Sequence, residues 1–167
     1  APSDLKVAEC FYKKGSKEVS VVLNTKITKA ACGRLVEDIL TLPKTSLGCV
    51  MAYCVYYQCS IYLVDLKKKI YLPYIHSAAE QTVVLYKNAD EKWPAYYIDT
   101  EQQLHTLEYL TMHCMCLNSY EKPLKSASGY KLSDLQSMAC LMNIDCDAKL
   151  KKNELYEKIV LHCVPDF

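Results

Sequence analysis

The stretch that decides the fold of this chain covers residues 130–162 and reads YKLSDLQSMACLMNIDCDAKLKKNELYEKIVLH. Ser133 and Gln136 have the spacing of a capping box, in which two side chains satisfy backbone N–H groups at a helix start. Apolar residues then recur at intervals of three and four, which predicts one buried helix face. Asn143 tolerates left-handed backbone geometry, so we expect it to end this helix. The apolar face would consist of Leu135, Met138, Ala139 and Met142.

A second helix is expected after a short extended segment. In residues 144–150 the apolar side chains alternate without a helical period, which indicates extended backbone. The second helix then begins near residues 151–153. Its buried face would consist of Leu155, Ile159 and Cys163. Residues 130–167 are therefore predicted to form a helix–extended loop–helix module.

This order of elements resembles the SAP and Rho N-terminal class of small helical modules, with the likeness in residues 141–159. Asn143 stands where a glycine often follows the first helix, and the loop lacks the glycine usual in SAP modules. The likeness is therefore closer to the Rho-type variant. Members of the class mostly bind DNA or RNA through the first helix start and the loop before the second helix. The resemblance implies the binding residues Tyr130, Lys131, Lys149, Lys151 and Lys152.

Charge limits what such binding can be. The chain has 167 residues and a formal net charge of +1, so it lacks an overall attraction to polyanions. Acidic residues outnumber lysines in residues 130–167, and Arg34 is the only arginine in the chain. Lysines act as point charges on a phosphate backbone, whereas base reading favours arginine. We expect weak, salt-sensitive backbone contact, or a helical pair that only docks on protein.

The rest of the chain predicts an α+β domain in residues 1–120, followed by a linker at 121–129 that is rich in proline, serine and glycine. Residues 5–12 and 18–23 are expected to form a hairpin around a Lys-Lys-Gly-Ser turn. Thr28 is expected to cap a helix that ends before Pro43.

Further helices and a sheet are expected in residues 45–110. A helix capped by Thr45 or Ser46 is apolar nearly all round to residue 57, which is typical of a buried helix. Thr100 and Gln103 form another capping box, before a helix that carries Leu104 and Leu107. Four short runs rich in β-forming residues predict a small mixed or antiparallel sheet. These runs are residues 60–64, 69–72, 82–86 and 95–98.

The helix and strands of residues 47–99 also resemble the later half of an ovarian-tumour-type (OTU) cysteine protease domain. In that family a catalytic histidine stands in a His-Tyr pair, but the matching place here reads Pro94-Ala95-Tyr96-Tyr97. The family's Asp-Gly-x-Cys nucleophile motif is also missing. A cysteine protease needs a thiolate activated by an imidazole. The resemblance thus implies a degenerate, non-catalytic relative, and a domain of this kind with a SAP-like tail is similar to proteins of large DNA viruses.

Ten cysteines are present, but their spacing matches no disulfide scaffold. Without a secretory signal or a membrane-spanning apolar run, we expect reduced thiols, an intracellular location such as the nucleus, a viral factory or a virion, and no membrane partner. His113-Cys114-Met115-Cys116 is the most metal-like cluster, yet it provides only one compact pair of ligands. We therefore expect no metal and no cofactor.

These patterns favour a non-enzymatic, nucleic-acid-associated protein whose first domain contacts protein. One alternative is a structural or assembly protein, such as a virion or scaffold component, that uses the helical module for docking. A second is a diverged cysteine hydrolase, in which a cysteine pairs with His76, His105 or His113, although no local signature selects one.

Overall fold

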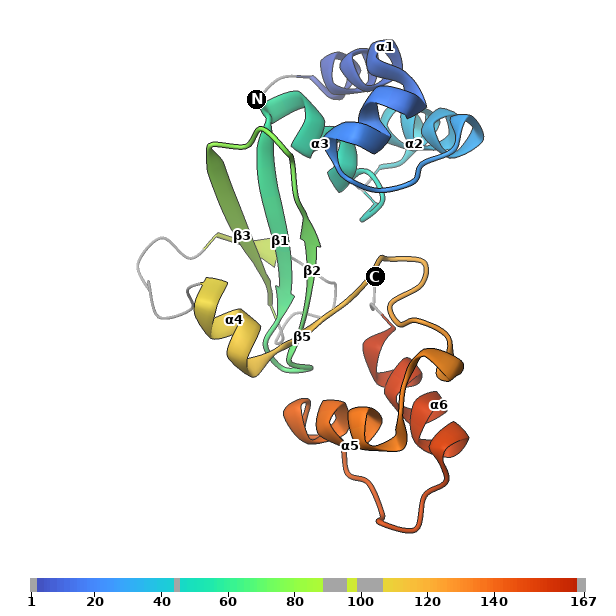
Figure 1. Cartoon of the computed structure of the whole chain (residues 1–167). Coiled ribbons are helices and arrows are strands. Elements are labelled where there is room, and N and C mark those ends of the chain that lie inside the picture. Colours follow the sequence, from blue (N-terminus) through green and yellow to red (C-terminus); the bar gives the residue numbers. More distant parts are fainter. Residues whose placement is uncertain (1–2, 44–45, 89–95, 99–106, 165–167) are drawn as a thin grey trace. The chain divides into compact units, whose positions relative to one another are not determined.

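The computed structural model describes residues 3–43, 46–88, 96–98 and 107–164. These residues form helices and a mixed β-sheet, so the predicted α+β class is confirmed (Figure 1). The helices are α1 (Asp4–Val22), α2 (Lys29–Thr41), α3 (Val50–Tyr57), α4 (Leu107–His113), α5 (Leu132–Leu141) and α6 (Lys152–Cys163), with the 3-10 turn η1 (Ala127–Gly129). The strands are β1 (Cys59–Asp65), β2 (Ile70–Tyr74), β3 (Gln81–Lys87), β4 (Tyr96–Tyr97) and β5 (Met115–Cys116).

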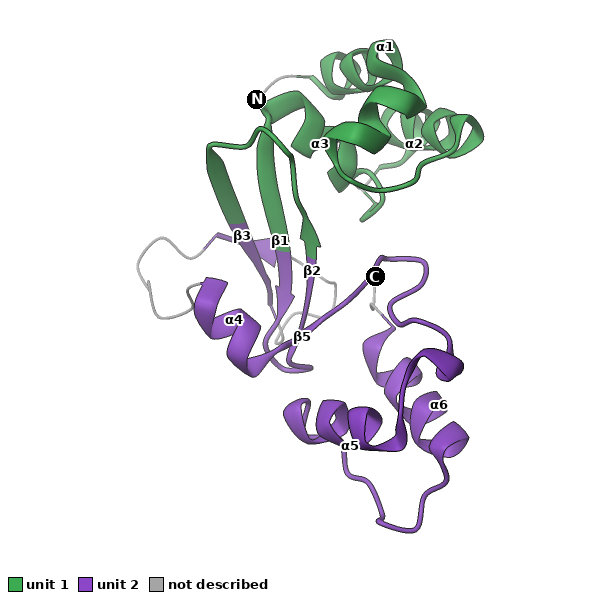
Figure 2. Ribbon diagram, in the orientation of Figure 1, with its two compact units in different colours: residues 1–62, 73–83 green, residues 63–72, 84–167 purple. Residues whose placement is uncertain are grey.

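The chain divides into two compact units, which Figure 2 shows in different colours. The first unit consists of residues 1–62 and 73–83, and the second consists of residues 63–72 and 84–167. The segment 121–129 lies inside the second unit. Its role as a linker between two domains stays a prediction.

The expected hairpin in residues 5–23 is wrong, because this segment forms helix α1. Val7, Phe11 and Val19 are buried in it at intervals of four and eight residues, which is the period of a helix face. The turn-forming residues 13–16 instead mark a kink, where Gly15 has φ +71° and ψ 167°. Glycine adopts such a positive φ without steric penalty, so the same residue that suggested a hairpin turn permits a kinked helix.

The two following helices are confirmed. Thr28 caps α2 by accepting a hydrogen bond from the Ala31 N–H at 3.1 Å, and the helix ends at Thr41, before Pro43. Helix α3 begins at Val50, later than expected, and ends at Tyr57, and its C-cap Gln58 has left-handed backbone geometry. Its buried residues are Val50, Ala52, Cys54 and Val55.

Strands are observed in all four predicted runs, although β4 covers only Tyr96–Tyr97 of the run at 95–98, and the sheet order is β4-β3-β1-β2-β5. Strand β4 pairs antiparallel with β3, whereas β5 pairs parallel with β2. Strand β5 was not predicted because two residues are too short to show a periodic pattern. Its backbone is held where the Met115 N–H donates to the Lys69 carbonyl at 2.8 Å and the Leu117 N–H donates to the Tyr71 carbonyl at 2.9 Å.

Within the second unit, the turn between β1 and β2 contacts the end of α6. The Lys68 ammonium donates to the Val164 carbonyl at 3.0 Å, and the Lys68 carbonyl lies 2.8 Å from Nε2 of His162. Asp65 receives the Lys68 N–H at 3.0 Å and forms an ion pair with Lys87 at 3.6 Å. Hydrogen bonds therefore hold the C-terminal end of α6 against this turn.

Candidate functional site

The two C-terminal helices begin in the same way. The Lys131 N–H donates to the Asp134 carboxylate at 2.8 Å, and the Lys151 N–H donates to the Glu154 carboxylate at 2.9 Å. A lysine ammonium cannot accept a hydrogen bond, so each pair makes only the half of a capping box in which the acid closes on the N-cap. The predicted box between Ser133 and Gln136 is wrong, because Ser133 already lies inside α5. The start signal is Lys-x-x-acid, and it occurs twice.

The end of α5 agrees with the sequence. Asn143 has φ +55°, and its N–H donates to the Cys140 carbonyl at 3.2 Å. The Ile144 N–H donates back to the Ala139 carbonyl at 2.8 Å. This pair of bonds is a Schellman motif, in which an αL residue turns the chain out of the helix.

The predicted apolar faces of α5 and α6 form one small core. Each residue expected on these faces is buried, and the Cys163 thiol lies 3.6 Å from the Met142 sulfur. The buried side chains are Leu135, Met138, Ala139, Met142, Leu155, Ile159 and Cys163. The helix–extended loop–helix arrangement in residues 132–163 is thus observed in the structure.

The loop between the helices is shaped by its two aspartates. The Asp147 carboxylate accepts the Lys149 N–H at 3.0 Å, and the Asp147 carbonyl accepts the Leu150 N–H at 3.0 Å. The Asp145 carbonyl accepts a hydrogen bond from the Lys158 ammonium on α6. These contacts fix the turn that leads Lys149 and Lys151 into the start of α6.

A tyrosine pair joins the starts of the two helices. Tyr130 precedes α5, Tyr156 lies in the second turn of α6, and their ring centres are 6.4 Å apart. Both hydroxyls bind the backbone of Lys125: the Tyr130 hydroxyl accepts its N–H at 3.1 Å, and the Tyr156 hydroxyl donates to its carbonyl at 2.6 Å. Lys152 lies four residues before Tyr156, on the same face of α6.

The five predicted binding residues therefore fall into two groups. Tyr130 belongs to the tyrosine pair, Lys131 follows it at the N-cap of α5, and Lys152 lies one turn before Tyr156 in α6. Lys149 and Lys151 lie in the loop and at the N-cap that lead into α6. Within the described part of the chain, none of these four ammonium groups forms an ion pair. The four positive charges are thus available to an anionic partner.

Two contributors to this surface were not predicted as binding residues, namely Tyr156 and Lys125. Tyr156 contacts residues 26 and 31 positions earlier, and no local pattern encodes such a contact. The only hint in the sequence is that Tyr156 stands four residues after Lys152, so the two side chains lie on the same helix face.

The most deeply buried thiols differ from a catalytic nucleophile in their pKa. Burial raises the pKa of Cys54 to about 12, with a further contribution from Cys59, and burial raises the pKa of Cys163 to about 11. A nucleophilic cysteine needs a lowered pKa instead. All ten cysteines are free, which agrees with the expected reduced state.

The metal-like cluster is dispersed. Cys114 is buried, while Met115 and Cys116 form β5 and so direct neighbouring side chains to opposite faces. The described residues contain no group of three or more His, Cys, Asp or Glu side chains that could hold a metal ion.

The place that corresponds to the OTU histidine is partly described. Tyr96 and Tyr97 form β4, where they pair with Lys87 and Tyr86 of β3. Pro94 and Ala95, like the predicted capping box at 100–103, lie outside the described residues.

No helix in the described residues is both long enough and apolar enough to cross a membrane. No protein-family model, curated protein or solved structure shows significant similarity to this chain.

Proposed function

We propose that this chain is a non-enzymatic nucleic-acid-associated protein whose C-terminal helical pair contacts the sugar-phosphate backbone of DNA or RNA and whose N-terminal part contacts protein. The observation that carries the proposal is the placement of Lys131 and Lys151 at the N-caps of α5 and α6, with ammonium groups that form no ion pair within the described residues.

The physical argument concerns the helix dipole. A helix N-terminus carries a partial positive charge and attracts anions, and phosphates bind readily there. A lysine at the same end is repelled by the dipole, so it stabilises the protein less than an acidic residue would. The arrangement is instead favourable for a bound phosphate, which is attracted by both the dipole and the ammonium group.

The acidic residues limit the strength of binding. Asp134 and Glu154 lie in the first turns of the same helices, and Asp147 lies in the loop between them. Their charges reduce the local positive potential. We expect affinity to be weak and to fall steeply with salt, because backbone binding is driven by counterion release. The likeness to SAP and Rho-type modules, which mostly bind nucleic acid, supports the same proposal.

The test is a triple charge reversal, Lys149→Glu, Lys151→Glu and Lys152→Glu. This variant is expected to lose retention on DNA at about 50 mM salt. The side chains replaced make no ion pair within the described residues, and acidic residues in a first helical turn are stabilising by about 0.3–1 kcal/mol. Loss of binding with an unchanged or higher melting temperature would therefore not reflect unfolding.

The matched control reverses three exposed lysines on α1, by Lys6→Glu, Lys13→Glu and Lys17→Glu. It changes the net charge by the same amount and is expected to retain binding. Equal loss in both variants would show that only net charge matters. A wild-type protein that binds neither DNA nor RNA at this salt concentration would end the proposal.

A structural or assembly role is the second candidate, and exposed apolar residues at the C-terminal end of α6 and just after it favour it. Leu161 is 75% exposed and Val164 is 44% exposed. If docking on protein is the function, Leu161→Asp is expected to remove the chain from its assembly, while the triple charge reversal leaves it there. Co-sedimentation of both variants with the purified assembly distinguishes the two roles.

A further inference from the structure

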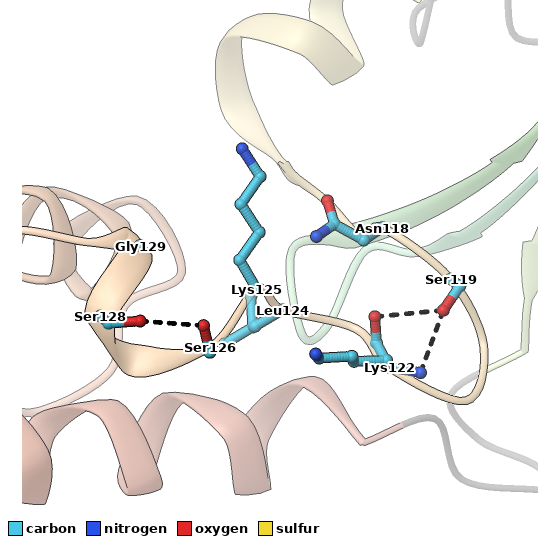
Figure 3. Close-up of a pocket in the computed structure, with 8 residues that line it drawn as sticks. All are labelled: Asn118, Ser119, Lys122, Leu124, Lys125, Ser126, Ser128 and Gly129. Carbon is cyan, nitrogen blue, oxygen red and sulfur yellow. Dashed lines mark hydrogen bonds between the residues drawn. The ribbon is translucent and has the colours of Figure 1, made fainter.

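A polar hollow lies in the segment just before the helical pair, entirely within the second unit (Figure 3). It has a volume of about 510 Å³. Its lining residues are Asn118, Ser119, Lys122, Leu124, Lys125, Ser126, Ser128 and Gly129. The segment that the sequence suggested as a plain linker therefore has a shaped surface.

Local hydrogen bonds hold the frame of this hollow. The Ser119 hydroxyl accepts the Lys122 N–H at 3.0 Å and donates to the Lys122 carbonyl at 3.1 Å. The Asn118 N–H donates to the Pro123 carbonyl at 2.8 Å, and Leu124 is only 3% exposed. With Lys125 bound by the two tyrosine hydroxyls, both ends of the loop are fixed.

The hollow is chemically suited to an anion. Its lining includes two lysines, three serines and an asparagine amide, and none of the lining residues carries a carboxylate. Within the described residues, neither Lys122 nor Lys125 has an ion-pair partner for its ammonium group. Figure 3 shows the Asn118 amide and the Lys122 ammonium directed toward the side that carries Lys125 and Ser126.

The two serines add a hydroxyl donor. Oγ of Ser126 and Oγ of Ser128 are 3.1 Å apart, so one hydroxyl donates to the other. The accepting hydroxyl keeps its own hydrogen available for a ligand oxygen. Ammonium and hydroxyl donors around a shallow open site match the several acceptor oxygens of a phosphate.

We propose that this hollow is a phosphate-binding subsite that extends the nucleic-acid surface of the helical pair to residues 118–129. The inference rests on the proposed function, since the phosphate is taken to belong to a DNA or RNA strand. Lys125 links the two regions, because its backbone is bound by Tyr130 and Tyr156 while its side chain lines the hollow.

The test compares Lys122→Gln/Lys125→Gln with a control, Lys13→Gln/Lys17→Gln on α1. The substitutions keep the backbone contacts of Lys125, so the fold is expected to be unchanged. Removing a phosphate contact is expected to weaken DNA or RNA binding about tenfold and to reduce the slope of log K against log salt by about 1. The control is expected to match the wild type in both quantities.

Backbone amide NMR provides the readout that locates the ligand. Titration with a short oligonucleotide is expected to shift the amides of residues 118–129 in the wild type and not in the Lys122→Gln/Lys125→Gln variant. A parallel titration with inorganic phosphate shows whether the phosphate group alone is enough. Shifts with both ligands, or with the oligonucleotide only, support the subsite.

The outcomes separate this inference from the proposed function. If the triple reversal at residues 149–152 abolishes binding but Lys122→Gln/Lys125→Gln behaves like the control, the subsite is wrong and the proposed function stands. If the wild type binds no nucleic acid, the proposed function fails, and the phosphate titration alone decides the hollow. Shifts of its amides would then show that the hollow binds free phosphate and not a nucleic-acid strand, and no shifts would overturn the site.

Discussion

At the scale of single residues, two glycines show how backbone geometry decides what a substitution does. Gly15 has φ +71°, a conformation that other residues rarely adopt, whereas Gly33 lies inside helix α2 with ordinary geometry. An added Cβ would contact nothing within 4 Å at either position. Any difference between the two substitutions therefore comes from the backbone and not from crowding.

We predict that Gly15→Ala lowers the free energy of unfolding by about 1–2 kcal/mol, because an L-residue is strained at this φ. Gly33→Ala is its control and is expected to raise the free energy by about 0.5–1 kcal/mol, since alanine is the better helix former. Urea unfolding followed by circular dichroism measures both changes. The same sign for the two variants would contradict the kinked geometry of α1.

The burial of His76 leads us to expect that the stability of the first unit depends on pH. The side chain is only 7% exposed, and its Nδ1 accepts the Ala78 N–H at 3.1 Å. Burial, and then the charge of Lys14, lower the pKa of His76 below its ordinary value of 6.5. The unfolded chain therefore takes up a proton at a higher pH than the folded chain does.

Neutral His76 therefore contributes fully to the free energy of unfolding above pH 6.5, and this contribution is lost as the pH falls through 6.5 toward the lowered pKa. We predict that the wild-type melting temperature decreases between pH 7 and pH 5 more than that of His76→Gln, which cannot be protonated. Calorimetry across this range makes the comparison. Equal slopes for both proteins would show that His76 does not control the effect.

At the scale of elements, the Lys-x-x-acid pairs predict where helix stability lies. Asp134 and Glu154 each accept an N-cap N–H and place a negative charge in the first helical turn. Asp134→Ala and Glu154→Ala are each expected to cost about 1 kcal/mol. Glu157→Ala, an exposed change further along α6, is the control and should cost much less. The denaturant midpoints of the three variants test this order.

Elements with a sustained apolar period could be predicted from sequence, and elements set by competing local signals could not. The spacing of apolar residues predicts helices α2, α5 and α6, the content of β-forming residues predicts strands β1 to β3, and the residue type of Asn143 predicts the left-handed stop of α5. The segment around Gly15 was assigned to a hairpin because local turn chemistry outweighed the spacing of Val7 and Phe11. The two residues of β5 depend on pairing with β2, which only tertiary structure supplies.

The residues of the candidate site also fall into some that the local sequence predicts and others that it does not. The local sequence correctly predicts the start of the second helix at Lys151 and Lys152, whereas for the first helix it predicts a start at Ser133 and the observed N-cap is Lys131. The role of Tyr156 could not be predicted, because its contacts join residues 26 and 31 positions apart. The hollow at 118–129 is formed by neighbouring residues, but the composition of this segment is that of a plain linker and does not reveal its shape. In this protein, local sequence predicts which charges stand at helix ends, whereas packing decides which of them meet.

At the scale of the whole molecule, the segment 121–129 provides the clearest contrast. Its composition predicts an open linker that proteases cut readily. In the structure Leu124 is buried, and Lys125 is bound at both backbone groups by Tyr130 and Tyr156. Cleavage after Lys125 therefore requires the loop to open from the helical pair.

Trypsin measures that opening, because it cuts after Lys125 but not between Lys122 and Pro123. We predict that Tyr156→Phe increases the cleavage rate at Lys125 about fivefold, since losing one hydrogen bond costs about 1 kcal/mol. Tyr12→Phe, at an exposed position on α1, should leave the rate unchanged. A wild-type rate equal to that of Tyr156→Phe would mean that the tyrosine hydroxyl does not restrain the segment, which would also remove the preorganised frame from the proposed phosphate subsite.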